Sequence, residues 1–365
     1  MSVSIPVKYN GKTHYNIELR SDFNELSSKL TELGYTSSTK LMIVSDSNVS
    51  GYYLSELKLS LQNAFDYVSE FVFEAGEKSK NLDTVSRLYE ELIKKHFERR
   101  DLLIALGGGV VGDLTGFCAA TYLRGIDFIQ LPTSLLSQVD SSIGGKTGVD
   151  CMQYKNMVGA FYMPKLVYMN LSVLKTLPSE QFSSGMGEII KHGMIRDRAY
   201  YDWLSSNSDK IKSLDPAALE HMISRSCEIK RSVVEEDPTE KGIRAILNFG
   251  HTIGHAVEKL SDFSLFHGHC VAIGCVAAVL ISKSIGKDIS ENDIAGMYDV
   301  FKRFDLPVSI SNRLIVDEIF ETTRSDKKME AGRIKFILLN SLGDAYIEYA
   351  LSEAQIKNAI SSIIV

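Results

Sequence analysis

Three short stretches of this sequence contain residue types that can bind a metal ion. Residues 248–255 read NFGHTIGH, residues 267–269 read HGH, and residues 187–193 read GEIIKHG. One carboxylate with two imidazoles suits a catalytic divalent cation, normally zinc or a first-row neighbour. Such a set leaves coordination positions open for substrate oxygens. These stretches therefore indicate a catalytic metal site.

The spacing within the first stretch predicts how its side chains are arranged. If this part of the chain is helical, a separation of four residues places His251 and His255 on one face. Arg244 and Asn248 extend the same face backwards. We therefore expect a metal and an anionic group to be bound close together.

A glycine-rich run follows a predicted strand. Residues 102–106 (LLIAL) lead directly into GGGVVGD at 107–113, after which a helical pattern begins. Glycines at such a turn let backbone N–H groups approach a phosphate, and the helix N-terminus adds a favourable dipole. A dinucleotide pyrophosphate fits this turn. Because strict GxGxxG spacing is absent, a plain tight turn is the alternative.

A second polar run, residues 140–150, contains a Gly-Lys-Thr tripeptide at 145–147. It lacks the spacing of a Walker A loop. Together with Lys155 and Asn156 just beyond, it predicts a loop that delivers polar groups to a small ligand. A solvated surface loop is the alternative.

The order of the predicted elements indicates an α/β fold with two domains. Buried strands are expected at 41–44, 71–73, 102–106, 128–131 and 166–169, with helical segments between several of them. This alternation is typical of a mostly parallel sheet with helices on both faces. After residue 178 the pattern becomes helical as far as about residue 312, and residues 333–339 and 345–349 could pair as a hairpin. We therefore expect one domain at 1–178 and a mostly α-helical one at 179–365.

Composition and charge restrict the partners and the compartment. The net charge of −6 argues against a broad nucleic-acid or membrane-binding surface, although local clusters of lysine and arginine could still bind an anionic substrate. Five cysteines without a CxxC pair indicate reduced thiols. No secretory signal and no apolar segment of membrane-spanning length is recognised. A cytoplasmic protein is expected.

Taken together, the stretches between about residues 46 and 333 resemble the 3-dehydroquinate synthase family of sugar-phosphate cyclases. The resemblance implies a Rossmann-like NAD-binding domain at 1–178 and a metal- and substrate-binding domain at 179–365. It also implies a tightly held NAD, a Zn2+ or Co2+ ion, and a homodimer.

The resemblance further assigns individual residues. The metal ligands would be Glu188, His251 and His267. The NAD contacts would be Asp46, Asn48, Glu77, Lys80, Gly108, Gly109, Val110, Asp113, Thr133, Ser134, Asp140, Lys146, Lys155, Lys175, Thr176 and Leu177. The substrate contacts would be Lys146, Asn156, Lys191, Lys230, Arg244, Asn248, His255, either Lys327 or Lys328, and Arg124 from the partner subunit.

The implied activity is the conversion of 3-deoxy-D-arabino-heptulosonate 7-phosphate to 3-dehydroquinate and phosphate, through transient oxidation by NAD. His255 is the expected proton shuttle, because imidazole titrates near working pH, and Lys146 is expected to assist through its charge. The chain departs from the family pattern at His269, where relatives usually have Glu, which would place a further imidazole near the ion. It also has Ser134 where Thr is usual, and Asp150-Cys151 where Asn-His or Asn-Leu is common.

Three other functions fit parts of this pattern. Another sugar-phosphate cyclase would use the same cofactors on a different sugar, although Lys230, Arg244 and Asn248 together favour the dehydroquinate reaction. A metal-dependent polyol dehydrogenase would release NADH as a net product. A catalytically silent NAD-binding or assembly protein would not need the metal-ligand motifs.

Overall fold

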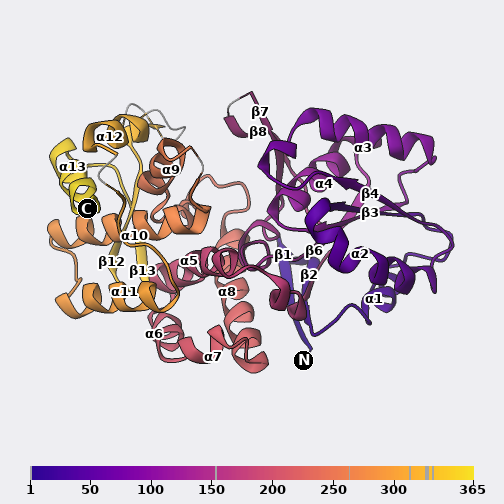
Figure 1. The fold of residues 1–365 in the computed structure, drawn as a ribbon, viewed down its shortest axis with the longest axis horizontal. Coiled ribbons are helices and arrows are strands. Elements are labelled where there is room, and N and C mark those ends of the chain that lie inside the picture. Colours follow the sequence, from indigo (N-terminus) through magenta and orange to yellow (C-terminus); the bar gives the residue numbers. More distant parts are fainter. Residues whose placement is uncertain (1, 153, 263, 312–313, 325–328, 331–332) are drawn as a thin grey trace. The chain divides into compact units, whose positions relative to one another are not determined.

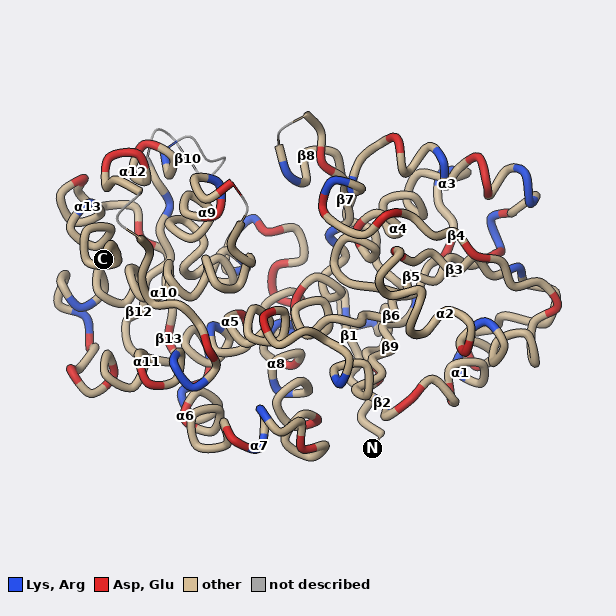
Figure 2. Tube along the Cα trace, in the orientation of Figure 1, with Lys and Arg blue, Asp and Glu red and all other residues tan. Residues whose placement is uncertain are grey.

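The chain forms two compact units in the computed structural model, Met1–Leu177 and Pro178–Val365 (Figure 1). The structure describes residues 2–152, 154–262, 264–311, 314–324, 329–330 and 333–365. Acidic and basic residues are interspersed along both units rather than separated by sign (Figure 2). An anionic ligand would therefore be bound by individual cationic side chains rather than by a uniformly basic face.

The first unit is built on a seven-stranded sheet with the order β1-β2-β9-β6-β5-β3-β4. Its strands are β1 (Val3–Tyr9), β2 (Lys12–Arg20), β3 (Leu41–Asp46), β4 (Val68–Phe73), β5 (Leu102–Gly107), β6 (Asp127–Pro132) and β9 (Leu166–Asn170). Only β1 and β2 pair antiparallel, and the other neighbouring strands of this sheet pair parallel. The mostly parallel sheet predicted from the sequence is confirmed.

Helices cover both faces of this sheet. They are α1 (Leu26–Glu32), α2 (Ser47–Gln62), α3 (Leu82–Lys94) and α4 (Gly109–Thr121), with 3-10 turns at Glu77–Ser79, Tyr122–Arg124 and Leu171–Thr176 and a π-helical turn at Ser137–Ser141. One apolar cluster joins α3 and α4 to alternate sheet residues such as Leu103. A second cluster joins α1 and α2 to the intervening residues, such as Leu102 and Ile104. Strands that are buried on both faces have nearly continuous apolar sequences, and for this reason they could be predicted from the sequence.

Two antiparallel pairs of this unit are absent from the sequence-based prediction. One is the pair β1–β2. The other is formed by β7 (Lys146–Cys151) and β8 (Tyr154–Phe161), which pair where a polar loop was expected. Glycines allow the two strands to approach, since a Cβ atom on Gly159 would lie 2.5 Å from the Thr147 carbonyl oxygen. β7 is mostly polar and contains a glycine, so its sequence pattern does not indicate an extended strand.

The second unit is mostly helical, as predicted. Its helices are α5 (Ser179–Arg196), α6 (Arg198–Ser206), α7 (Ser208–Lys212), α8 (Pro216–Glu236), α9 (His251–Leu260), α10 (His267–Ser284), α11 (Glu291–Arg303), α12 (Val316–Arg324) and α13 (Glu353–Ser362), with a 3-10 helix at Ile243–Asn248. Its strands are β10 (Met329–Glu330), β11 (Arg333–Ile334), β12 (Phe336–Ser341) and β13 (Asp344–Glu348). β12 and β13 pair antiparallel and confirm the predicted hairpin.

Helix α10 lies at the centre of this unit and packs closely on α5 and α9. A Cβ atom on Gly268 would lie 1.8 Å from the Ser184 carbonyl oxygen of α5. A Cβ atom on Gly274 would lie 1.9 Å from the carbonyl oxygen of Gly250, just before α9. Only glycine permits these approaches, so the three helices that carry the predicted metal ligands are held together at backbone contact.

The sequence-based expectation that no apolar segment is long enough to cross a membrane needs correction. α10 has 18 residues with a mean hydropathy of 1.3, which makes it a candidate membrane span by length and composition. However, 72% of it is buried inside the protein. Its apolar character follows from its central position, because a helix that is largely covered by other elements needs little polar surface.

Candidate active site

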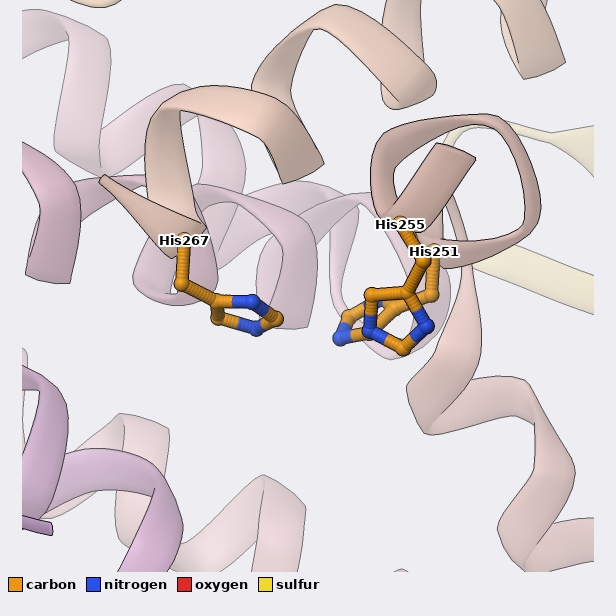
Figure 3. Close-up of side chains that lie close together, drawn as sticks. All are labelled: His251, His255 and His267. Atoms are coloured by element: carbon orange, nitrogen blue, oxygen red, sulfur yellow. The ribbon is translucent and has the colours of Figure 1, made fainter. Parts of the chain in front are cut away.

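The predicted metal ligands converge in the second unit. His251 and His267 are the first residues of α9 and α10, and Glu188 lies within α5. Oε1 of Glu188 is 3.5 Å from Nε2 of His251 and 3.8 Å from Nε2 of His267. The rings of His251, His255 and His267 project from their helices into one region (Figure 3). Donor nitrogens of these three rings lie within 4.8 Å of one another.

Glu188 is fully buried, and its two carboxylate oxygens are in different environments. Oε2 accepts a hydrogen bond from the Lys191 ammonium, which also donates to the Leu247 carbonyl oxygen at 2.6 Å. Oε1 has no hydrogen-bond partner among the residues that the structure describes. A buried acceptor without a partner is unfavourable by about 1–3 kcal/mol. A cation beside Oε1 would satisfy it, so the environment of Glu188 fits a metal ligand.

The two histidines predicted as metal ligands are oriented by hydrogen bonds on the far side of each ring. Nδ1 of His251 lies 3.0 Å from the Phe249 carbonyl oxygen, and Nδ1 of His267 lies 3.1 Å from Oε2 of Glu258. With a proton on each Nδ1, both Nε2 atoms present lone pairs toward Glu188 Oε1. Metal-binding histidines are commonly oriented in this way. One carboxylate oxygen and two imidazole nitrogens fit zinc or cobalt.

His255 belongs to the same group of rings. Its centroid is 5.1 Å from that of His251 and 5.7 Å from that of His267, and the residue is half-buried. It follows His251 by one helical turn on α9, as the spacing predicts. The geometry allows either a proton-transfer role beside the metal or a place in the ligand set.

The continuous helical face predicted from Arg244 to His255 is wrong. The chain forms a 3-10 helix at Ile243–Asn248, and α9 starts separately at His251. Gly250 between them has φ +79°, and a Cβ atom there would lie 2.6 Å from Cys275 Sγ. The break therefore follows from a left-handed residue packed against α10. It gives His251 the first position of its helix.

Several predicted substrate-binding cations are buried in the second unit. Lys191 is 1% exposed, Lys230 on α8 is 6% exposed and Arg244 is 2% exposed. One guanidinium nitrogen of Arg244 donates to the Pro238 carbonyl oxygen at 2.6 Å. In this structure Lys191 donates a hydrogen bond to Glu188, the predicted metal ligand, and this is a positioning contact that the sequence did not reveal. Lys327 and Lys328 lie outside the described residues.

The turn that precedes Arg244 contains a candidate residue that sequence reasoning missed. Glu240 has φ +58° and accepts a hydrogen bond at 2.9 Å from Nδ2 of Asn248, a predicted substrate contact. Asp237 organises the turn, because it accepts backbone N–H groups of Lys241, Gly242 and Arg244. Burial raises the pKa of Asp237, but these donors outweigh that effect and the pKa lies below its ordinary value. Only the acidic Asp-Pro-Thr-Glu-Lys-Gly composition could have suggested such a turn.

His269, where the family resemblance led us to expect Glu, lies next to α5, the helix that carries Glu188. Its Nε2 lies 3.1 Å from Ser183 Oγ, and its ring packs edge-on against Phe266. Burial lowers the pKa of His269 below its ordinary value. It is not part of the group formed by His251, His255 and His267.

In the first unit, the predicted glycine turn joins β5 to α4. Gly107 ends β5, and Gly108 is the N-cap of α4 with no side-chain cap. The first N–H groups of α4 are therefore not capped by a side chain and are suited to an anion. A Cβ atom on Gly109 would lie 3.1 Å from Ser141 Oγ, so this turn is closely approached by the segment after β6.

Two predicted NAD-binding residues have structural partners. Asp46 caps α2, because its Oδ1 accepts from the backbone N–H groups of Asn48 and Val49, both at 2.9 Å. Lys80 is 4% exposed, and its ammonium donates to Asp113 Oδ2 and Asn156 Oδ1, both at 2.6 Å. The contacts of Lys80 bring together three residues that the resemblance assigns to ligands, Lys80, Asp113 and Asn156.

The remaining predicted positions of the first unit lie in turns and at strand ends. Thr133 and Ser134 follow β6, Asp140 lies in the π-helical turn, and Glu77 begins the first 3-10 turn. Lys146 and Lys155 are exposed on β7 and β8, and Val110 is in the first turn of α4. Lys175, Thr176 and Leu177 end the unit, where Thr176 hydrogen-bonds Tyr53. Arg124 is exposed and has φ +66°.

Comparisons with known proteins agree with this arrangement. Residues 70–184 match the family described as 3-dehydroquinate synthase N-terminal, and residues 185–329 match 3-dehydroquinate synthase C-terminal. A 3-dehydroquinate synthase of Ruminiclostridium cellulolyticum is 42% identical over 332 residues, 91% of each chain. That of Acetivibrio thermocellus is 41% identical over 350 residues, 96% of each chain.

Solved structures show the same architecture. A 2-deoxy-scyllo-inosose synthase in complex with carbaglucose-6-phosphate, NAD+ and Co2+ superposes with a TM-score of 0.88 at 25% identity, covering 99% of this chain and 100% of that one. A 2-epi-5-epi-valiolone synthase from Streptomyces hygroscopicus with NAD+ and Zn2+ has a TM-score of 0.86 at 23% identity, covers 98% of both chains, and supports the fold alone. From the family matches over most of its length and its relatives at about two-fifths identity, this chain belongs to the 3-dehydroquinate synthase family.

Proposed function

We propose that this protein is a phosphate-eliminating cyclase that converts 3-deoxy-D-arabino-heptulosonate 7-phosphate to 3-dehydroquinate and inorganic phosphate. The observation that carries the proposal is the convergence of Glu188 Oε1 with Nε2 of His251 and Nε2 of His267. The relatives named 3-dehydroquinate synthase support the reaction. The reaction would place the enzyme among carbon–oxygen lyases of the shikimate pathway, and we propose a cytoplasmic location.

Two groups would be held by this chain. Glu188, His251 and His267 would bind a divalent ion, Zn2+ or Co2+, and residues 1–178 would bind NAD through the glycine turn at the start of α4. When bound, NAD accepts a hydride from a substrate hydroxyl and later returns it, while the divalent ion acidifies the substrate hydroxyls. The 2-deoxy-scyllo-inosose synthase that resembles this chain was solved with NAD+ and Co2+, which supports both assignments.

The residues around the ligand set would handle protons and charge. His255 would accept the proton of the hydroxyl that is oxidised, because imidazole side chains are suited to proton transfer near neutral pH. The carbonyl formed acidifies the neighbouring C–H, so that phosphate can leave, and the departing phosphate itself would take that proton. Ring opening and intramolecular aldol closure then complete the product.

A substrate with a carboxylate and a phosphate needs cations for both ends. We assign Lys230, Arg244 and Asn248 to one group of contacts and Lys146 and Asn156 to another. Their support is the family resemblance, and Lys230 and Arg244 are both buried in the second unit. Lys191 would act through Glu188, and the assignment of Lys327 or Lys328 stays a prediction from the sequence.

We also propose a homodimer in which Arg124 reaches the partner's substrate. Leu123 and Arg124 both have positive φ, 51° and 66°, and Leu123 is 42% exposed. Two successive left-handed residues other than glycine are strained, and such strain is common where a side chain has to be presented for function. The residues Met157 and Phe161 of β8 are about half exposed, which provides apolar surface for a second copy.

One assay tests the proposed reaction. The protein is supplied with heptulosonate phosphate, NAD and a divalent ion, and phosphate and NADH absorbance are recorded together. The proposal predicts phosphate release without accumulation of NADH. Accumulating NADH would instead indicate a polyol dehydrogenase. Consumption of glucose 6-phosphate but not of heptulosonate phosphate would indicate a cyclase of another specificity, as in the relative bound to carbaglucose-6-phosphate.

A further inference from the structure

The side chain of Lys80 connects two parts of the first unit that are assigned to different ligands. Its ammonium donates to Asp113 Oδ2 on α4 and to Asn156 Oδ1 on β8, both at 2.6 Å. Burial alone would lower the pKa of Lys80, but the attraction of Asp113, with help from Glu77 and Asp150, raises it above its ordinary value. A charged and buried ammonium therefore joins the helix of the glycine turn to the β7–β8 ribbon.

Backbone contacts attach the ribbon at the same place. The Asp150 N–H donates to the Lys80 carbonyl oxygen at 2.8 Å, and Asn81 forms a parallel bridge with Asp150. The Asn156 N–H donates to Asp150 Oδ1 at 2.8 Å. Because β8 is largely exposed, little apolar burial is available to fix Asn156. These polar contacts are what hold it, although its φ of +52° is unfavourable.

The hydrogen bond from Lys80 determines which groups of the Asn156 side chain can bind a ligand. An asparagine amide has one acceptor oxygen and two donor hydrogens on nitrogen. Since Lys80 binds Oδ1, the orientation of the amide is fixed, and Nδ2 donates to none of the residues that the structure describes. An amide held by its oxygen in this way has both N–H donors of Nδ2 available for a ligand, which suits an anion that has only acceptors, such as a phosphate group.

We infer that Lys80 is a positioning residue that fixes the amide of Asn156 as a donor for the phosphate group of the substrate. This role differs from a direct contact with NAD, which the resemblance implies for Lys80. It rests on the proposed function insofar as that function assigns Asn156 to the substrate. The same lysine also orients Asp113 beside the glycine turn, so loss of its charge should affect NAD binding independently of Asn156.

A double-mutant cycle tests this inference. The variants are Lys80→Met, Asn156→Ala and the double variant, and Lys78→Met, an exposed lysine two residues away, serves as the matched control. Binding of inorganic phosphate is measured by calorimetry at saturating NAD, with NAD affinity measured separately. We expect each single variant to weaken phosphate binding about tenfold, and the double variant to be no weaker than Asn156→Ala by more than about twofold. Lys78→Met should bind phosphate as the wild type does.

Several results would overturn the inference. Additive losses in the double variant, about a hundredfold in all, would mean that Lys80 contacts phosphate independently. Unchanged phosphate affinity in Lys80→Met, or a wild-type protein that does not bind phosphate, would also refute it. Asn156→Asp keeps the acceptor for Lys80 but removes the donors, so it should lose phosphate binding even if Lys80→Met folds poorly, and retained binding would contradict the inference. Turnover of heptulosonate phosphate is not used, so failure of the proposed reaction would be seen separately.

Discussion

Oε2 of Glu258 lies 3.1 Å from Nδ1 of His267, on the opposite side of the imidazole from the nitrogen that faces Glu188. Glu258 is 7% exposed and lies on α9, two turns after His251. A buried carboxylate in this position holds the proton on Nδ1 and leaves Nε2 as the ligand atom. Such a contact also strengthens a histidine as a metal ligand. Metal affinity should therefore depend on a residue that is not itself a ligand.

Glu258→Gln should raise the dissociation constant for Zn2+ or Co2+ by about 10- to 100-fold, because the amide weakens the hydrogen bond and can reverse its direction. The affinity is measured by competition with a chromophoric chelator. The matched control is Glu236→Gln, which changes an exposed glutamate of α8 that pairs with Arg196 at the surface. Equal affinity in Glu258→Gln and the wild type would show that this contact does not tune the site.

Glu188→Gln should destabilise the metal-free protein as well as abolish metal binding. The substitution leaves the Lys191 ammonium, 1% exposed, without its carboxylate partner. Loss of one member of a buried ion pair typically lowers the free energy of unfolding by about 3–5 kcal/mol. The double variant Glu188→Gln with Lys191→Met should recover part of that loss, as measured by urea unfolding in EDTA. If the double variant is less stable than the single one, the pairing explanation is wrong.

Gly268→Ala should disturb both packing and metal binding. Its Cβ atom would lie 1.8 Å from the Ser184 carbonyl oxygen, so α10 would have to move away from α5 and carry His267 away from Glu188. We expect a loss of about 1–3 kcal/mol in the free energy of unfolding together with weaker zinc binding. Gly296→Ala is the control, because its Cβ atom would lie 3.9 Å from Tyr201 Oη, and alanine stabilises a helix by about 0.5–1 kcal/mol. Equal effects of the two substitutions would contradict the packing argument.

His255→Ala should lower the rate of phosphate release by about 10²- to 10⁴-fold while leaving one metal ion bound per chain. The reason is that His255 lies beside the proposed ligand set and is assigned to proton transfer. Turnover and metal content are measured on the same preparation. An unchanged rate would exclude the proton-transfer role. Loss of the metal would place His255 among the ligands.

The sequence predicted those elements of the structure whose residue pattern is visible within a short stretch of the chain. Strands such as β3 and β5 were predictable because both of their faces are buried, and the glycine turn before α4 was predictable from its position after β5. The β7–β8 ribbon was missed because its glycines serve a close approach between strands rather than a turn. Prediction succeeded where residues close in sequence determine the conformation. It failed where contacts with residues distant in sequence determine it.

In the candidate site, too, contacts between residues distant in sequence could not be predicted. The types of the ligand residues pointed to a metal, and the family resemblance supplied their assignment. The break at Gly250 was not predictable, because it depends on contact with α10. The internal partners of Lys80 and Lys191, and the pairing of Glu258 with His267, depend equally on segments that meet only in the fold.

The most direct test of the central claim is an anomalous difference map from crystals of the zinc-loaded protein, recorded on both sides of the zinc absorption edge. The account predicts one peak per chain, about 2.0–2.2 Å from a carboxylate oxygen of Glu188 and from Nε2 of both His251 and His267. A peak bound by His251, His255 and His267 with Glu188 out of reach, or the absence of a peak in this region, would contradict it.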